Sequence, residues 1–161
     1  MAQATNRAVI GLISDTHGLL RPSVHLAFQG VDLILHAGDV GGSDILDELR
    51  IIAPVQAVFG NTDPPGDPSL RDKLILEHGG LDIHVSHGHE LGVPTLAKLL
   101  AAYPQRVIVY GHTHRQLVSK VGNQLVINPG AAGARRFKLA PSVARLTIEN
   151  GEAEVEIVPL A

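Results

Sequence analysis

Three continuous apolar runs in the first half of the chain predict buried strands. They cover residues 8–14, 31–35 and 55–59. Between the runs, one amphipathic stretch opens at Pro22 and continues to about Gln29, and another opens at Ser43 and continues to about Ile51. Proline favours the first helical position and serine is a good N-cap, so both stretches predict helices. This strand–helix–strand order implies parallel pairing.

The second half of the chain alternates apolar and polar positions over short segments separated by glycine-containing turns, which predicts antiparallel hairpins. The expected hairpins pair residues 73–77 with 81–86, 117–121 with 124–127, and 143–148 with 153–158. A helix from Pro94 to about Tyr103 and a strand at 106–110 separate the first two hairpins. The simplest union of both halves is an α/β fold, a mixed β-sandwich of two sheets flanked by helices, formed as a single domain by residues 1–161.

Composition narrows the class of protein. Hydrophobic residues make up 45% and aromatic residues 3% of the 161 residues, which suits a sheet packed by helices. The absence of cysteine excludes disulfides and thiolate metal sites. The polar residues 1–7 predict a flexible tail, and no apolar run approaches the ~20 residues that cross a bilayer, so we expect a cytoplasmic protein with no membrane partner.

Polar residues of metal-binding types cluster where the predicted strands end. These residues are Asp15, His17, Asp39, Asn61, His87, His112 and His114. Because the carboxyl ends of parallel strands share one edge of a sheet, we expect these side chains to converge. Nitrogen and oxygen donors without thiolate suit Mn, Fe, Zn, Co or Ni better than Ca or Mg. A carboxylate can bridge two ions, so the set suits more than one cation.

Five motifs follow one another along the chain, each after an apolar strand-like run. They are Asp15-Thr16-His17, Gly38-Asp39, Gly60-Asn61, His87-Gly88 and Gly111-His112-Thr113-His114. In these motifs the sequence resembles the calcineurin-like metallophosphoesterases, and their spacing is most similar to the small single-domain branch of bacterial and archaeal phosphodiesterases. The resemblance extends from about Val9 to Val158. It implies the β-sandwich fold of that family and two divalent metal ions, with manganese the first candidate.

The resemblance also implies a role for each position. One metal would be held by Asp15, His17 and His114, and the second by Asn61, His87 and His112. Asp39 would bridge the two ions together with a water or hydroxide. A hydroxide held in this way is a strong nucleophile near neutral pH. The implied activity is therefore hydrolysis of a small phosphodiester, with Asp39 and Asn61 taking part in catalysis.

One position departs from the larger members of the family, which carry a histidine directly after the Gly-Asn pair. That histidine can protonate the leaving group, whereas this chain has Thr62 there. A threonine hydroxyl is too weak an acid to replace imidazolium near pH 7. His89, two residues after His87, is the candidate for this proton transfer, and a solvent-exposed loop residue is the alternative.

Other polar residues near the motifs each have a functional and a structural interpretation. His36 and Asp63 would orient metal ligands, or would serve only in packing and turn formation. Gly130 would offer a backbone N–H to phosphate, or would form a plain turn. Arg135 would contact the anionic group of the substrate or a partner subunit, or would remain solvated beside Arg136. Ordinary surface or strand positions are expected for His25, His78 and His84.

The main alternative to an enzyme is a protein-binding scaffold of the same fold, such as the retromer subunit that resembles this branch but has a degraded metal site. Here every ligand position holds a suitable side chain, which favours an enzyme. Phosphomonoesterase, pyrophosphatase or nuclease activity is a second alternative. The formal net charge of −3 without a broad basic face argues against binding to duplex nucleic acid. The antiparallel edges near the C-terminus leave a homo-oligomer open.

Overall fold

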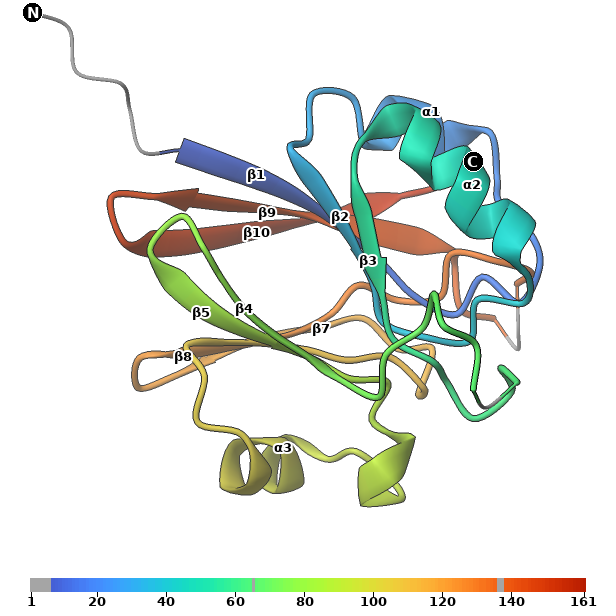
Figure 1. Cartoon of the computed structure of the whole chain (residues 1–161). Helices are drawn as coiled ribbons and strands as arrows, with labels where there is room; N and C mark the ends of the chain where they lie inside the picture. The colour runs from blue at the N-terminus through green and yellow to red at the C-terminus, as the bar shows by residue number, and fades with distance from the viewer. Residues whose placement is uncertain (1–6, 65, 136–137) are drawn as a thin grey trace, which may run out of the picture.

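Two five-stranded sheets pack face to face, with helices on their outer faces (Figure 1). The structure is a computed structural model that describes residues 7–64, 66–135 and 138–161. The strand order is β10-β9-β1-β2-β3 in the first sheet and β4-β5-β6-β8-β7 in the second. The predicted mixed β-sandwich flanked by helices is confirmed.

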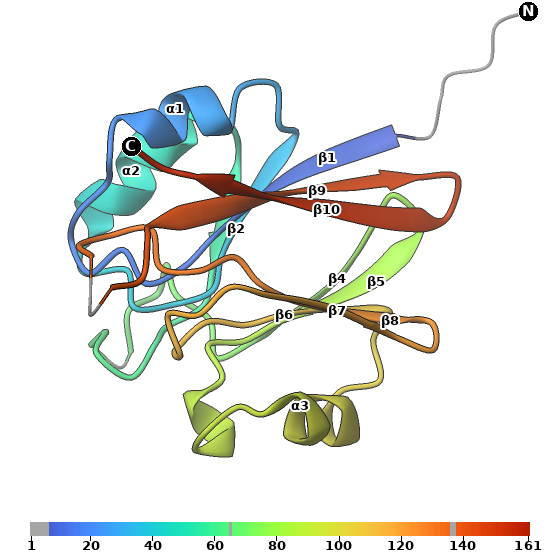
Figure 2. The same cartoon turned by 180° about the vertical axis from the view of Figure 1, so that it is seen from behind.

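The first sheet consists of β1 (Arg7–Ile13), β2 (Leu33–His36), β3 (Val55–Ala57), β9 (Ser142–Glu149) and β10 (Glu152–Pro159). β1, β2 and β3 pair in parallel, as the strand–helix–strand pattern predicts, and β9 pairs antiparallel with both β1 and β10. The helices α1 (Ser23–Ala27) and α2 (Ser43–Ile52) connect the parallel strands and cover the outer face of this sheet (Figure 2).

The second sheet consists of β4 (Leu74–His78), β5 (Leu81–Val85), β6 (Val107–Val109), β7 (Leu117–Val121) and β8 (Gln124–Asn128). The predicted hairpins β4–β5 and β7–β8 are antiparallel. β5, β6 and β8 pair in parallel, so this sheet also delivers several carboxyl ends to one edge. The helix α3 (Leu96–Ala102) lies on its outer face, where Leu99 packs near Ile108 and Tyr110.

Buried aliphatic side chains hold these layers together. Ile10 and Leu12 of β1 belong to the core between the sheets, whereas Val9 and Ile13 face the helices. This alternation follows from the two-residue period of a strand, and here it buries both faces of β1. Burial of each such side chain contributes about 1.5–3 kcal/mol to the free energy of unfolding.

Several element boundaries differ from the sequence predictions. α2 has Gly42 at its N-cap with a φ of 141°, and Ser43 is the first helical residue rather than the cap. The short 3₁₀ helix η1 (His89–Leu91) was not predicted. Arg7 belongs to β1 rather than to the expected tail, and residues 1–6 lie outside the described residues. Within the described ranges, every helix is too short or too polar to cross a bilayer.

We expect Phe28→Ala to lower the free energy of unfolding by about 3–5 kcal/mol, because the fully buried ring would leave a cavity. The Phe28 ring packs directly against Gly11: a Cβ added to Gly11 would lie only 2.9 Å from the ring atoms. Leu26→Ala is the control, because Leu26 is 77% exposed and should change stability by less than about 0.5 kcal/mol. Denaturant unfolding measures both, and equal effects would contradict the packing described.

Candidate metal centre

The predicted ligand residues converge at the edge where strands of both sheets end. Asp15 and His17 follow β1, Asp39 follows β2, and Asn61 follows β3. The second sheet contributes His87 after β5, together with His112 and His114 after β6. Side chains separated by up to a hundred positions therefore meet at one rim, and the close approaches below establish this directly.

One part of the cluster is formed by Asp15, His17 and His114. Nε2 of His114 lies 3.3 Å from Oδ1 of Asp15, and Nε2 of His17 lies 3.8 Å from the same oxygen. The two imidazole Nε2 atoms are 3.4 Å apart. Three potential donor atoms thus point at one small volume, an arrangement that could hold a metal ion.

The adjoining part is formed by Asp15, Asp39 and His87, a second group that could hold a metal ion. Nε2 of His87 lies 3.2 Å from Oδ2 of Asp39 and 3.8 Å from Oδ1 of Asp15. Nε2 of His17 lies 3.5 Å from the same Asp39 oxygen. Asp39 therefore stands between a histidine of each group, as a bridging carboxylate would.

Asn61 and His112 lie beside this second group. Oδ1 of Asn61 is 3.2 Å from Nδ1 of His112, and the rings of His112 and His87 have centroids 5.2 Å apart. Burial, followed by the charge of a protonated His87, lowers the pKa of His112. Its ring is therefore neutral near pH 7, as a metal-ligating imidazole must be.

Two buried atoms of the cluster that could bind a metal ion have no hydrogen-bond partner among the described residues. Oδ1 of Asp15 and Nε2 of His87 are buried and form no hydrogen bond with any described residue. Nδ1 of His87 donates to the carbonyl oxygen of Ala37 at 2.8 Å, which turns Nε2 toward the cluster, where the neutral imidazole would offer a lone pair to a cation. Because unsatisfied buried polar atoms are costly, these residues fit a bound cation.

The charges of the cluster also suit cations. Burial would raise the pKa of Asp39, but the nearby imidazole of His87 and the hydrogen bond from the N–H of Thr62 outweigh it and lower the pKa to about 2. Burial opposes ionisation of Asp15 as well, yet contacts with His114 and His17 hold its pKa far below the usual range. Burial disfavours protonation of His87, but the two carboxylates raise its pKa overall. Both carboxylates are therefore ionised at neutral pH.

The backbone of the ligand loops is locally strained. Left-handed conformations occur at Asp15 (φ 55°), His17 (φ 46°), Asp39 (φ 55°), His112 (φ 70°) and His114 (φ 63°). Such conformations cost roughly 1–3 kcal/mol each for residues other than glycine and concentrate at functional sites. Glycines allow the loops to approach, because a Cβ on Gly60 would collide with the carboxylate of Asp39 and one on Gly111 with the side chain of Ser14.

Asp63 and His36 support the loops that carry the ligands. The carboxylate of Asp63 accepts hydrogen bonds from the N–H groups of Val40, Gly41 and Gly60, at 3.0, 3.1 and 2.9 Å. It thereby ties the Asp39 loop to the Asn61 loop. His36 is buried, accepts from the N–H of Gly38 at 3.1 Å, and lies 3.0 Å from the hydroxyl oxygen of Thr16.

The remaining predicted residues occupy different surroundings. The ring of His89 lies beside the cluster, with centroids 5.3 Å from His87 and 6.4 Å from His112. The N–H of Gly130 donates to Oδ1 of Asn128, which agrees with a turn rather than with an amide directed at phosphate. Arg135 is exposed, and its guanidinium donates to the carbonyl oxygen of Lys138 rather than to a ligand residue. Arg136 lies outside the described residues.

Sequence reasoning missed several supporting side chains. The hydroxyl of Ser14 donates to Oδ2 of Asp15 at 2.6 Å, which leaves Oδ1 for the cluster. Glu90 accepts hydrogen bonds from the N–H of Gly88 at 2.9 Å and from the hydroxyl of Tyr103 at 2.6 Å. His84 is buried and stacks on Tyr103, with ring centroids 3.7 Å apart. Of these residues, only Ser14 could have been identified from the sequence as a supporting side chain, since it directly precedes the predicted ligand Asp15.

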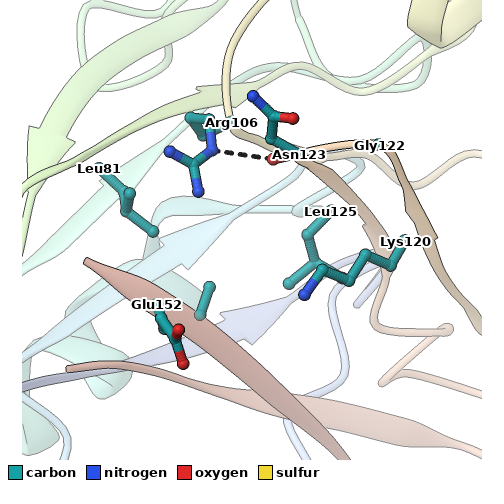
Figure 3. A pocket seen from close by; sticks show the side chains of 8 residues that line it. Leu81, Arg106, Lys120, Gly122, Asn123, Leu125 and Glu152 are labelled. Atoms are coloured by element: carbon teal, nitrogen blue, oxygen red, sulfur yellow. Dashed lines mark hydrogen bonds between the residues drawn. The ribbon is translucent and has the colours of Figure 1, made fainter. Parts of the chain in front are cut away.

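A separate hollow of about 280 Å³ lies at the opposite ends of the sheets (Figure 3). It is bordered by Arg106 before β6, Lys120 near the β7–β8 turn, and Leu81 at the start of β5. Nε of Arg106 donates to the carbonyl oxygen of Asn123 at 2.8 Å. These two basic residues therefore lie away from the carboxylate–imidazole cluster and do not contribute to it.

The sandwich fold and the buried group of carboxylates and imidazoles at the strand ends suit a metal-dependent hydrolase of phosphoesters. Comparison with known families agrees with this class. Residues 9–151 match the model of the calcineurin-like phosphoesterase superfamily domain, and the chain belongs to this superfamily. The superfamily generally uses two divalent metal ions.

Relatives cover nearly the whole chain. A protein of Methanothermobacter thermautotrophicus named as a probable metallophosphoesterase is 34% identical over 93% of this chain and 91% of its own length. A phosphodiesterase of Methanocaldococcus jannaschii is 30% identical over 75% of this chain and 82% of its own. Both support the small single-domain branch indicated by the motif spacing.

Solved structures share the fold. A structure described as a novel archaeal phosphodiesterase has a TM-score of 0.76 and 26% identity, over 94% of this chain and 99% of that one. Vps29 of Cryptosporidium parvum has a TM-score of 0.80 over 96% of this chain and 98% of that one, but only 19% identity. The second likeness shows the common fold alone.

The buried His84 leads to a pH-dependent stability. Burial lowers its pKa from 6.5 to about 4, so between these values the unfolded chain binds a proton that the folded protein excludes. Stability should therefore rise with pH from about 4 to 6.5, by up to about 3 kcal/mol from this residue. Denaturant unfolding of the metal-free protein across this range measures the slope. His84→Gln should reduce the slope, and an unchanged slope would contradict the assignment.

Proposed function

We propose that the protein is a phosphodiesterase that depends on two divalent metal ions bound at the strand-end cluster. The observation that carries the proposal is the pair of unpartnered buried atoms, Oδ1 of Asp15 and Nε2 of His87, with the ionised Asp39 beside them. An arrangement of this kind is costly without a cation and favourable with one. The superfamily and the phosphodiesterase relative support the same reaction class.

The ligand assignment is the one that the family resemblance implies, and the first group of the cluster supports the first of its two sites. Asp15, His17 and His114 would hold one ion, Asn61, His87 and His112 the other, and Asp39 would bridge them. When bound, the two ions would activate a water for attack on phosphorus and neutralise charge on the phosphate. The protein itself fixes each imidazole and keeps both carboxylates ionised. Manganese is our first candidate for these imidazole and carboxylate donors, with Fe, Zn, Ni or Co also suitable.

A poor leaving group must be protonated as it departs, and the hydroxyl of Thr62 is too weak an acid to supply that proton. The side chain of Thr62 is exposed, and its N–H donates to Oδ1 of Asp39 at 3.0 Å, so the residue serves to orient Asp39. His89 is the side chain beside His87 and His112 that can donate a proton. We propose His89 as a general acid for small phosphodiesters that have poor leaving groups.

A protein-binding scaffold is the second candidate, favoured by the likeness to Vps29 structures. All seven predicted ligand positions here hold metal-binding side chains, and the close approach of five of them supports the enzyme. These five are Asp15, His17, Asp39, His87 and His114. Metal content and turnover separate the two functions. A chain that binds about two metals and hydrolyses bis(4-nitrophenyl) phosphate is an enzyme, whereas metal-free, inactive protein would favour the scaffold.

We expect Asp39→Asn to reduce hydrolysis of bis(4-nitrophenyl) phosphate by at least about a hundredfold, because the bridging carboxylate would be lost. Metal content measured by elemental analysis should fall by at least one ion per chain. Asp47→Asn is the control, because Asp47 lies exposed on α2 and pairs with Arg50. Full activity and full metal content in Asp39→Asn would contradict the assignment.

Leaving-group dependence tests the proton donor. If no side chain protonates the leaving group, aryl diesters should be cleaved far faster than alkyl diesters, and log kcat/KM should fall steeply as the leaving-group pKa rises. A shallower dependence is expected if His89 supplies the proton. If His89 donates the proton, His89→Gln should slow alkyl diesters by about 10²–10⁴-fold while changing aryl diesters by less than about threefold. Equal slowing of both classes would show that His89 acts on the metal site instead.

A further inference from the structure

A second cavity is bordered by the two loops that carry the proposed ligands Asp39 and Asn61. It has a volume of about 400 Å³ and lies between the first turn of α2 and the loop that joins β3 to β4. In Figure 1 this loop, drawn in green, passes below α2 at the edge where the strands end. Residues on its wall include Val40, Ser43, Leu46, Thr62, Pro64 and Leu70.

The cavity and the metal cluster share the same two loops. Val40 directly follows the proposed bridging Asp39, and Thr62 directly follows the proposed ligand Asn61. The N–H of Thr62 is bonded to the carboxylate of Asp39 at 3.0 Å. Asp63 fixes both loops through three backbone N–H groups. A phosphate at the cluster would therefore have its ester groups within reach of the cavity.

The chemistry of the wall selects a neutral group. Val40 and Leu46 are buried side chains that form an apolar floor, and Leu70 is partly buried beside them. Asp67, which is partly buried, also lines the cavity, and hydrogen bonds from Ser69 lower the pKa of its carboxyl and keep it ionised. A second phosphate or carboxylate would be repelled there, whereas an apolar group would gain from leaving water.

We propose that this cavity binds a neutral, largely apolar ester group of the phosphodiester whose phosphate occupies the metal cluster. The proposal rests on the proposed function and narrows its substrate class. Diesters with an aryl, branched alkyl or similar uncharged group would be preferred over diesters that carry a further anionic group. Long nucleic acids, whose adjacent phosphates would approach Asp67, fit poorly.

Phosphonates with one organic group test the cavity without turnover. In the metal-loaded wild-type protein, phenylphosphonate should bind at least tenfold more tightly than methylphosphonate, measured by calorimetry and by inhibition of bis(4-nitrophenyl) phosphate hydrolysis. With zinc bound, amide NMR shifts caused by phenylphosphonate should include residues 40–43 together with Thr62, Asp67 and Leu70. Methylphosphonate should leave Asp67 and Leu70 unshifted. Equal affinity for the two compounds would overturn the proposal.

Two variants sharpen the test. Ser43→Phe adds a ring at an exposed position on the cavity wall and should reduce the tenfold preference to less than twofold, with metal content unchanged. Asp47→Phe adds the same ring to an exposed position on α2 outside the cavity wall and should preserve the preference. Asp67→Asn should improve binding of 4-phosphonobenzoate at least threefold. A preference retained in Ser43→Phe, or lost equally in both ring variants, overturns the assignment.

The outcomes also separate this proposal from the proposed function. If the protein binds two metals, hydrolyses the diester and binds both phosphonates equally well, only the cavity assignment fails. If it binds neither metal nor phosphonate, the proposed function fails and the cavity assignment falls with it.

Discussion

One constraint determines the cluster: two buried carboxylates lie close to several imidazoles, and the hydrogen bonds of these side chains leave some of the facing atoms unsatisfied. Oδ2 of Asp15 is satisfied by Ser14 and by the N–H of His112, whereas Oδ1 is directed at the histidines. Left-handed backbone conformations at the ligand residues produce these directions. Strain of this kind persists only where the surrounding fold over-determines the loops, and here two sheets and three helices do so.

The general architecture could be predicted from the sequence because apolar periodicity and turn residues are local signals. The parallel β1–β2–β3 unit and the antiparallel hairpins followed from these signals alone. The gathering of the candidate ligand side chains at one rim could also be predicted, since each polar motif follows a strand and the carboxyl ends of parallel strands share an edge. Both facts together led to the expectation that His17 and His114 would lie close to Asp15, as they do.

The parts that could not be predicted depend on contacts between distant residues. Nothing in the local sequence indicates that Glu90 accepts from Tyr103, or that His84 stacks on the same ring. Gly42 rather than Ser43 caps α2, and its positive φ of 141° is a conformation that glycine adopts readily and residues with a Cβ rarely do. The positions of cavities also cannot be predicted from the apolar periodicity of the sequence, because their walls combine side chains from separate segments.

The two proposed ion sites draw on both halves of the sandwich, because Asp15 and Asp39 come from the first sheet and His87 and His114 from the second. A cation held between them would act as a cross-link joining the two sheets at one end, beyond the apolar core they share. The other end, around Arg106 and Glu152, has a hollow in place of such a cross-link. Metal binding would therefore restrict the relative motion of the two sheets at the end that carries the cluster more than at the opposite end.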